Sequence, residues 1–280
     1  MVKSNLKEKK VQSKANLKVV DNNAVKTTAY SDINLKKWRE YDHVKTDTLW
    51  EFPNRLKEGG HSNEYHGNYI PQIAQQIYER YTKKDDIVLD LFFGSGTSGI
   101  EAINMGRRCI GVELKDELAE SVSEKFTPKQ LVTDVNIICA DSASQLAKEK
   151  IEARLDIMGR KNAQLLMLHP PYDDIIKFSD KKEDLSNCAT TEEFYDLLEK
   201  GRFACLIIGD KYANSQHIPL GFECMARMNK LGFITKAIII KDMQGNERAK
   251  GKTANLWRYR ALAGGFYIFK HEYVMVFQKV

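Results

Sequence analysis

The sequence predicts an α/β fold in which a mostly parallel sheet is covered by helices on both faces. From Ile87 onward, short apolar runs alternate with segments of helical periodicity, as in successive strand–helix–strand units. The apolar runs are continuous rather than alternating with polar residues, which is typical of strands buried on both sides. A long polar stretch separates the last two apolar runs and predicts a final antiparallel hairpin at one edge of the sheet.

Seven apolar runs are expected to be strands, and six segments between or before them are expected to be helices. The first helix has Ile73, Ile77 and Tyr81 on one face, and Pro71 suits its first turn. The predicted strands are 87–93, 109–112, 135–139, 164–168, 203–208, 233–240 and 273–277. The predicted helices are 71–81, a segment around 100–103, 118–126, 143–155, 192–198 and 220–231.

Composition narrows the class of protein. The longest apolar runs, such as 203–208, are shorter than the roughly 18 residues that a membrane span needs. The N-terminus has no signal-peptide core. The five cysteines have no paired spacing for a zinc or redox site. We therefore expect a cytoplasmic protein without a metal centre.

Positive charge is unevenly distributed. Residues 1–20 carry six lysines and one glutamate, and residues 1–30 lack hydrophobic periodicity, so this segment is expected to be a disordered basic arm. One domain is expected over residues 31–280. Residues 241–260 carry six Lys or Arg and two acids, and such clusters can contact phosphates.

A glycine-rich loop, Asp90-Leu-Phe-Phe-Gly-Ser-Gly-Thr-Ser-Gly99, lies between a predicted strand and helix. Ligands of such folds bind at the carboxyl ends of the strands, where glycine permits close approach of the backbone. Glu113 ends the next strand and can accept hydrogen bonds from ribose hydroxyls. Asp141 follows the third strand and can accept from an adenine amino group. These acids, with Asp90, favour the cationic cofactor S-adenosylmethionine.

A nicotinamide dinucleotide remains an alternative, because the loop also satisfies the pattern G-x-G-x-x-G. Such a site holds a pyrophosphate at a helix N-terminus. Binding of S-adenosylmethionine instead of NAD would separate a methyltransferase from an oxidoreductase.

The fourth predicted strand ends in Leu168-His169-Pro170-Pro171-Tyr172. Here the sequence resembles the DNA amino-methyltransferases, which modify adenine N6 or cytosine N4. In that family the motif is Asp, Asn or Ser, then Pro-Pro and an aromatic residue. The resemblance extends to the glycine-rich loop, to His66-Gly-Asn-Tyr-Ile-Pro-Gln72 and to the final segment 271–279, and it runs from about Thr48 to the C-terminus.

The resemblance implies a Rossmann-like methyltransferase fold with a seven-stranded, mostly parallel sheet. It also implies that the segment around Tyr69 and Pro71 closes over the methionine moiety of S-adenosylmethionine. The residues expected to bind this cofactor are Tyr69, Pro71, Asp90, Phe92, Gly94, Ser95, Gly96, Thr97, Glu113 and Asp141.

The Pro-Pro-Tyr motif suits methylation of an exocyclic amine, whose lone pair is delocalised into the base. The carbonyl of Pro170 and a side-chain acceptor at His169 would accept the two N–H groups of the amine and favour its pyramidal, nucleophilic geometry. Transfer of the methyl group would then depend mainly on how the amine and the sulfonium are positioned. Tyr172 would stack on the flipped base. The expected catalytic set is His169, Pro170, Pro171 and Tyr172. Because His169 departs from the family motif, the choice between adenine and cytosine stays open.

Two stretches are candidates for contact with the target, 173–191 and 241–270, because they combine basic and aromatic residues. The alternative is that the aromatic residues of the second stretch pack onto the sheet. The residues expected to bind nucleic acid are Lys177, Arg248, Lys252, Trp257, Arg258 and Arg260.

The sequence therefore predicts an S-adenosylmethionine-dependent DNA methyltransferase that acts on a base flipped from the duplex, alone or beside a restriction or defence partner. One alternative is a methyltransferase-like subunit that binds nucleic acid without catalysis. Another is an enzyme that methylates a base of RNA.

Overall fold

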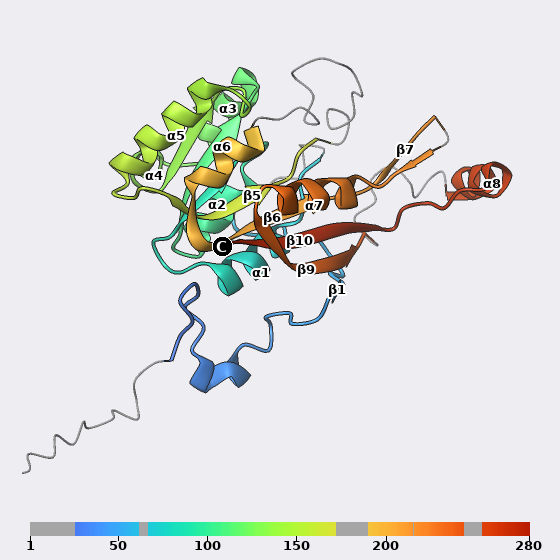
Figure 1. Cartoon of the computed structure of the whole chain (residues 1–280), viewed down its shortest axis with the longest axis horizontal. Coiled ribbons are helices and arrows are strands. Elements are labelled where there is room, and N and C mark those ends of the chain that lie inside the picture. Colours follow the sequence, from blue (N-terminus) through green and yellow to red (C-terminus); the bar gives the residue numbers. More distant parts are fainter. Residues whose placement is uncertain (1–25, 62–66, 172–189, 215, 244–253) are drawn as a thin grey trace, which may run out of the picture.

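The computed structural model describes residues 26–61, 67–171, 190–214, 216–243 and 254–280 (Figure 1). The main sheet consists of β1 (Leu49–Trp50), β2 (Ile87–Asp90), β3 (Arg108–Glu113), β4 (Val135–Cys139), β5 (Ala163–Leu168), β6 (Leu198–Ile208), β9 (Phe233–Asp242) and β10 (His271–Lys279). A separate hairpin consists of β7 (Lys211–Ala213) and β8 (Gln216–Ile218). The helices are η1 (Leu35–Glu40), α1 (Pro71–Tyr81), α2 (Thr97–Asn104), α3 (Asp116–Ser123), α4 (Pro128–Thr133), α5 (Gln145–Ile157), α6 (Thr190–Leu197), α7 (Leu220–Lys230) and α8 (Ala254–Gly264).

The main sheet has the strand order β1-β9-β10-β6-β5-β2-β3-β4. All neighbouring strands are parallel except β10, which runs antiparallel to both β6 and β9. The order reverses between β2 and β5, and in open α/β sheets ligands bind at the carboxyl ends of the strands beside such a point. The predicted Rossmann-like fold, with its mostly parallel sheet and final antiparallel pair, is confirmed.

The sheet has eight strands, so the predicted number of seven was wrong. The additional strand, β1, spans only two residues, which is too short to give a periodic sequence signal. It pairs in parallel with β9, placing Trp50 opposite Lys241, and the Trp50 side chain is buried. The final pair is consequently not at the sheet edge, because β10 lies between β6 and β9, and β1 covers the outer side of β9.

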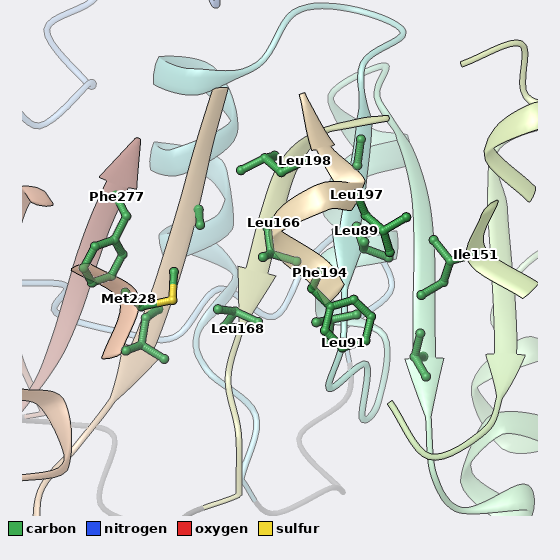
Figure 2. Packing of buried hydrophobic residues seen from close by; sticks show 14 of the residues in the cluster. Leu89, Leu91, Ile151, Leu166, Leu168, Phe194, Leu197, Leu198, Met228 and Phe277 are labelled. Atoms are coloured by element: carbon green, nitrogen blue, oxygen red, sulfur yellow. The ribbon is translucent and has the colours of Figure 1, made fainter. Parts of the chain in front are cut away.

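The alternating directions of side chains along each strand produce two hydrophobic cores. Ile87 and Leu89 of β2 face one core, whereas Val88 between them faces the other. Helices α5, α6 and α7 cover the first core, part of which Figure 2 shows, with Phe194 of α6 close to Leu91 and Ile151 of α5 beside the strands. Helices α1, α2 and α3 cover the second core. This two-sided burial explains why the strands read as continuous apolar runs.

Two elements near the carboxyl edge were not predicted. The β7–β8 hairpin follows β6 directly, and Asn214 at its turn has a positive φ of 50°. Helix α8 lies in the polar stretch between β9 and β10, where the sequence predicts no helix, and it projects away from the sheet (Figure 1). Tyr259 and Leu262 of α8 are 69% and 73% exposed. A helix that buries so little apolar surface gives no amphipathic pattern by which to recognise it.

The predicted basic arm and the first candidate insertion fall largely outside the described residues. Residues 1–25 and 172–189 are not described. Tyr30, at the end of the predicted arm, packs edge-on against Phe203 of β6, with ring centroids 4.8 Å apart.

A buried ion pair joins β9 to β10. Lys241 and Glu272 are directly opposite each other in the ladder, and Nζ lies 2.8 Å from Oε1. The two side chains are only 2% and 9% exposed. Removing one partner of such a pair leaves the other charge buried without compensation, which costs more than the pair itself contributes.

We predict that Glu272→Ala lowers the free energy of unfolding by about 3–5 kcal/mol, because the Lys241 ammonium group would remain buried alone. Urea denaturation measures the change. Glu40→Ala is the control, since it removes the exposed Lys37–Glu40 pair and should cost about 1 kcal/mol or less. Equal effects of the two substitutions would contradict the prediction.

Candidate functional site

The candidate site lies at the carboxyl ends of β2, β3 and β5, three neighbouring strands of the main sheet. In the ladder, Asp90 of β2 is opposite both Gly111 of β3 and Met167 of β5. The glycine-rich loop after β2 and the His-Pro-Pro sequence after β5 therefore begin side by side. The structure thus brings together the two motifs that sequence analysis singled out.

The glycine-rich loop is shaped by the packing of Phe93. The aromatic ring occupies space that a Cβ atom at Gly99 or Gly111 would need. Gly96 is the residue before α2 and has a φ of 83°, in the left-handed region that favours glycine. Gly94 also has a positive φ, 51°. These glycines are therefore required by the conformation of the loop.

Glu113 connects the loop to the end of β3. Its Oε2 accepts a hydrogen bond from the backbone N–H of Gly94 at 2.9 Å, and its Oε1 accepts from the N–H of Lys115 at 3.0 Å. A carboxylate offers about four lone-pair positions, so these two bonds leave acceptor capacity. The role of Glu113 as a ribose acceptor stays a prediction.

Asp90 is buried beneath the loop. Its Oδ1 accepts from the N–H of Phe92 at 2.9 Å, and its Oδ2 accepts from the hydroxyl of Ser98. Burial raises the pKa of Asp90 to about 6, against the lowering effects of these two hydrogen bonds and of His169. Asp90 thus supports the loop from inside.

Tyr69 and Asn68 tie the segment before α1 to the glycine-rich loop. The Tyr69 hydroxyl lies 2.5 Å from Ser98 Oγ, and the Asn68 side-chain amide donates to Ser95 Oγ. Burial raises the pKa of Tyr69 well above its ordinary value, so the phenol stays protonated. Sequence analysis missed Ser98 and Asn68, since neither lies at a motif position with a recognisable role.

His169 follows β5 and is partly buried between two backbone carbonyl groups. Nδ1 lies 2.9 Å from the oxygen of Ile207, and Nε2 lies 2.8 Å from the oxygen of Gly67. Its ring packs edge-on against Tyr69, with centroids 5.4 Å apart. A neutral imidazole can donate to only one of the two carbonyl oxygens, whereas a protonated ring can donate to both. The sequence contained no sign of this pairing, because Gly67 is 102 residues away.

The remaining predicted residues vary in their placement. Pro170 is buried and Pro171 is exposed, while Tyr172 lies outside the described residues. Asp141 is exposed at the end of β4, where its Oδ1 accepts from the N–H of Ala143 at 2.8 Å. Ser95 and Thr97 are buried in the loop, Phe92 is partly buried, and Pro71 is the first residue of α1.

Lys125 is a cation at the loop that sequence analysis missed. It lies shortly after α3, and its Nζ donates to the backbone carbonyl of Ser95 at 2.9 Å. The loop is therefore held by groups from β3, from the segment before α1 and from the segment after α3.

Of the residues expected to bind nucleic acid, Lys177, Arg248 and Lys252 lie outside the described residues. Trp257, Arg258 and Arg260 lie on α8. The Arg260 guanidinium group is 5.3 Å from the centre of the Trp257 ring. Because β9 runs parallel to β5 and β10 returns, α8 is at the carboxyl edge that carries His169 (Figure 1).

Comparison with known sequences shows which proteins this chain is similar to. A family model for N6/N4 methyltransferases, described as DNA methylase, matches residues 2–124, which include the glycine-rich loop and Glu113. A probable type III restriction-modification enzyme HindVI Mod subunit from Haemophilus influenzae is 28% identical over 188 residues, covering 65% of this chain and 25% of that protein. The type II methyltransferase M.MjaII from Methanocaldococcus jannaschii is 31% identical over 84 residues, covering 28% of this chain and 16% of that protein.

The chain spans a quarter or less of the length of these two curated relatives. Among solved structures, that of the [4+2]-cyclase SpnF has a TM-score of 0.50 and 11% sequence identity, covering 81% of this chain and 89% of that one. This similarity concerns the fold. None of the helices in the described part of the chain is long and apolar enough to cross a membrane. The sequence matches confirm the predicted resemblance of this chain to the DNA amino-methyltransferases.

Proposed function

We propose that this chain transfers a methyl group from S-adenosylmethionine to an exocyclic amino group of a DNA base, adenine N6 or cytosine N4. The observation that carries the proposal is the juxtaposition of two motifs on adjacent strands. The glycine-rich loop, with Glu113, follows β2, and His169-Pro170-Pro171 follows β5. The family match and the names of the curated relatives support the same chemistry.

The residues of the loop fit S-adenosylmethionine. Glu113 retains acceptor capacity for ribose hydroxyls, and the glycines leave backbone accessible where a Cβ would intrude. The carboxylates of Asp90 and Glu113 suit a ligand that carries a sulfonium and an ammonium group, whereas they would repel a pyrophosphate. When bound, this cofactor supplies an electrophilic methyl group. The buried Tyr69 would close the methionine end of the site.

At the end of β5, the chain would hold the amine rather than form a covalent bond to the base. The Pro170 carbonyl and His169 are proposed to accept its two N–H groups, and Tyr172 to stack on the flipped base. For His169 to accept through Nε2, the ring must lose its contact with the Gly67 carbonyl. We therefore propose that the segment around Gly67 shifts when the target base enters.

A catalytically silent subunit that binds DNA is the second candidate. The observation that favours it is the placement of both His169 ring nitrogens against carbonyl oxygens. In that case the chain would bind cofactor and DNA, and methyl transfer would require a partner chain. The Mod subunit relative suggests a restriction-modification partner.

Nucleoside mass spectrometry of DNA from cells that express the chain tests the proposal. We expect N6-methyladenine or N4-methylcytosine above the level in cells without it. Pro170→Ala is the test variant, because it removes the rigid ring while keeping the carbonyl. Pro219→Ala, before α7, is its matched control. RNA from the same cells shows whether RNA is the substrate instead. Cofactor and DNA binding by purified protein without any methylated base would favour the silent subunit.

The pKa of Asp90 predicts how cofactor affinity depends on pH. A bound cation favours the ionised carboxylate, so affinity should increase as the pH rises towards the pKa of about 6 and level off above it. One pH unit below that value only about a tenth of Asp90 is ionised, so affinity should fall by up to about tenfold.

Calorimetry with S-adenosylhomocysteine and S-adenosylmethionine at pH 5 and 7.5 measures this dependence. Asp90→Asn keeps an acceptor for Phe92 and places an amide beside Ser98, and it should remove the difference between the two pH values. A parent and variant with the same pH profile would show that Asp90 does not interact with the cofactor.

Helix α8 predicts a salt-dependent contact with DNA. Replacing Arg258 and Arg260 with alanine should weaken duplex binding and reduce the log–log salt slope by about 0.9 for each phosphate contact that is lost. Cofactor affinity should not change. Replacing Lys129 and Lys161, which are exposed at the opposite edge of the sheet, is the control. An unchanged salt slope in the arginine variant would show that α8 is not part of the DNA-binding surface.

A further inference from the structure

A second histidine, His217, contacts a buried carboxylate near the carboxyl edge of the sheet. His217 of β8 points its Nε2 at Oδ2 of Asp210, 3.0 Å away. Asp210 follows β6 and is buried. The same Oδ2 accepts from the Tyr273 hydroxyl at 3.1 Å, and Oδ1 accepts from the N–H of Gly221 in α7 at 3.2 Å. Asp210 thus receives three donors from three different elements.

This arrangement determines which nitrogen of His217 carries the proton. Burial, reinforced by Asp210, raises the pKa of Tyr273 to about 12, so its hydroxyl keeps its proton and donates it. An ionised carboxylate only accepts hydrogen bonds, so Nε2 of His217 must be a donor. In the neutral ring, the lone pair is then on Nδ1.

Nδ1 of His217 is available to a ligand. The side chain is 49% exposed, and in the described part of the chain no hydrogen-bond partner of Nδ1 is found. The ring packs against Tyr212 and Phe269, with centroid distances of 5.6 and 5.2 Å, and these two rings stack on each other at 4.9 Å. His217 therefore has a fixed ring with an exposed acceptor nitrogen. His169 differs, because both of its ring nitrogens face carbonyl oxygens.

His217 is held, through Asp210, beyond the carboxyl end of β6. β6 is the neighbour of β5, and His169 contacts the carbonyl of Ile207. Asp210 lies three residues beyond Ile207, roughly 10 Å along an extended chain. A nucleic acid whose target base is held at Pro170 would therefore bring a neighbouring base along the same edge of the sheet towards His217.

We propose that His217, oriented by Asp210, is a specificity-determining residue that accepts a hydrogen bond from a base amino group of the nucleic acid. The inference rests on the proposed function. Adenine and cytosine present an amino group in the major groove, whereas guanine and thymine present a carbonyl oxygen there. One position of the recognised sequence is therefore restricted to adenine or cytosine.

Asp210→Asn distinguishes the proposed role of Asp210, which is to orient His217, from a purely structural one. The asparagine oxygen is retained opposite the Gly221 N–H, so its NH₂ group takes the place of Oδ2, donating one hydrogen to Nε2 of His217 and the other to the Tyr273 hydroxyl oxygen. The proton of His217 then moves to Nδ1, which becomes a donor. Nitrogen-15 NMR of the ring distinguishes the two tautomers, and the His217 signals are assigned by their absence from His217→Ala.

The functional measurement is methylation of a randomised duplex DNA library, followed by sequencing of the methylated molecules. We expect the parent to prefer adenine or cytosine at one position by about tenfold, the scale of a single base contact. His217→Ala should lose that preference, and Asp210→Asn should reverse it towards guanine or thymine. His43→Ala is the matched control, because His43 is also half exposed and pairs with a carboxylate, Glu79, at 3.0 Å.

The outcomes separate this inference from the proposed function. A parent that methylates no DNA overturns both. A parent that methylates DNA with the same sequence preference as His217→Ala overturns the inference alone. Variants that lose activity equally on all sequences, with the Nε2–H tautomer unchanged in Asp210→Asn, also overturn it.

Discussion

The candidate site depends on one carboxylate, that of Glu113. Glu113 ends β3 and accepts hydrogen bonds from the backbone of Gly94, in the loop after β2, and of Lys115, in the turn before α3. The ends of two parallel strands are thereby fixed relative to each other. The Phe93 ring packs between β3 and α2, and it can do so because Gly111 and Gly99 have no side chain. A loop fixed in this way presents backbone and carboxylate oxygen to a ligand without the cost of ordering them upon binding.

The rest of the site is attached to this loop by side chains from distant parts of the sequence. Asn68 and Tyr69 reach Ser95 and Ser98, and Ser98 in turn donates to Asp90. His169 closes the arrangement from the other side through the Gly67 carbonyl. If the loop binds a cofactor as proposed, cofactor binding and movement of residues 67–70 would be coupled, because these residues contact the loop directly. Through this coupling, the proposed shift around Gly67 would affect the edge of the sheet at which the base is proposed to bind.

Elements with a strong local signal could be predicted from the sequence. The bounds of α1 and β4 agree residue for residue, because Pro71 marks one start and a compact apolar run defines the other. β1 has two residues, and among the described side chains of α8, at 257–264, none is buried, so neither element produces a periodic pattern.

The same distinction applies to the site. The positions of Glu113 and Asp90 beside the loop could be predicted from the sequence, since parallel strands bring their carboxyl ends to one edge. The partners of His169, Gly67 and Ile207, are defined only by the folded chain, and so is the Asp210–His217 pair.

The central claim is that Glu113 both holds the loop and binds the ribose of an adenosyl cofactor. Calorimetry that compares S-adenosylhomocysteine with its analogue lacking both ribose hydroxyls tests this claim most directly. The account predicts that the parent binds the analogue at least about tenfold more weakly, since a hydrogen bond to a charged group contributes about 1.5–3 kcal/mol. Glu113→Gln should discriminate less between the two ligands, whereas Glu117→Gln, exposed on α3, should behave like the parent. Equal affinity of the parent for both ligands would contradict the account.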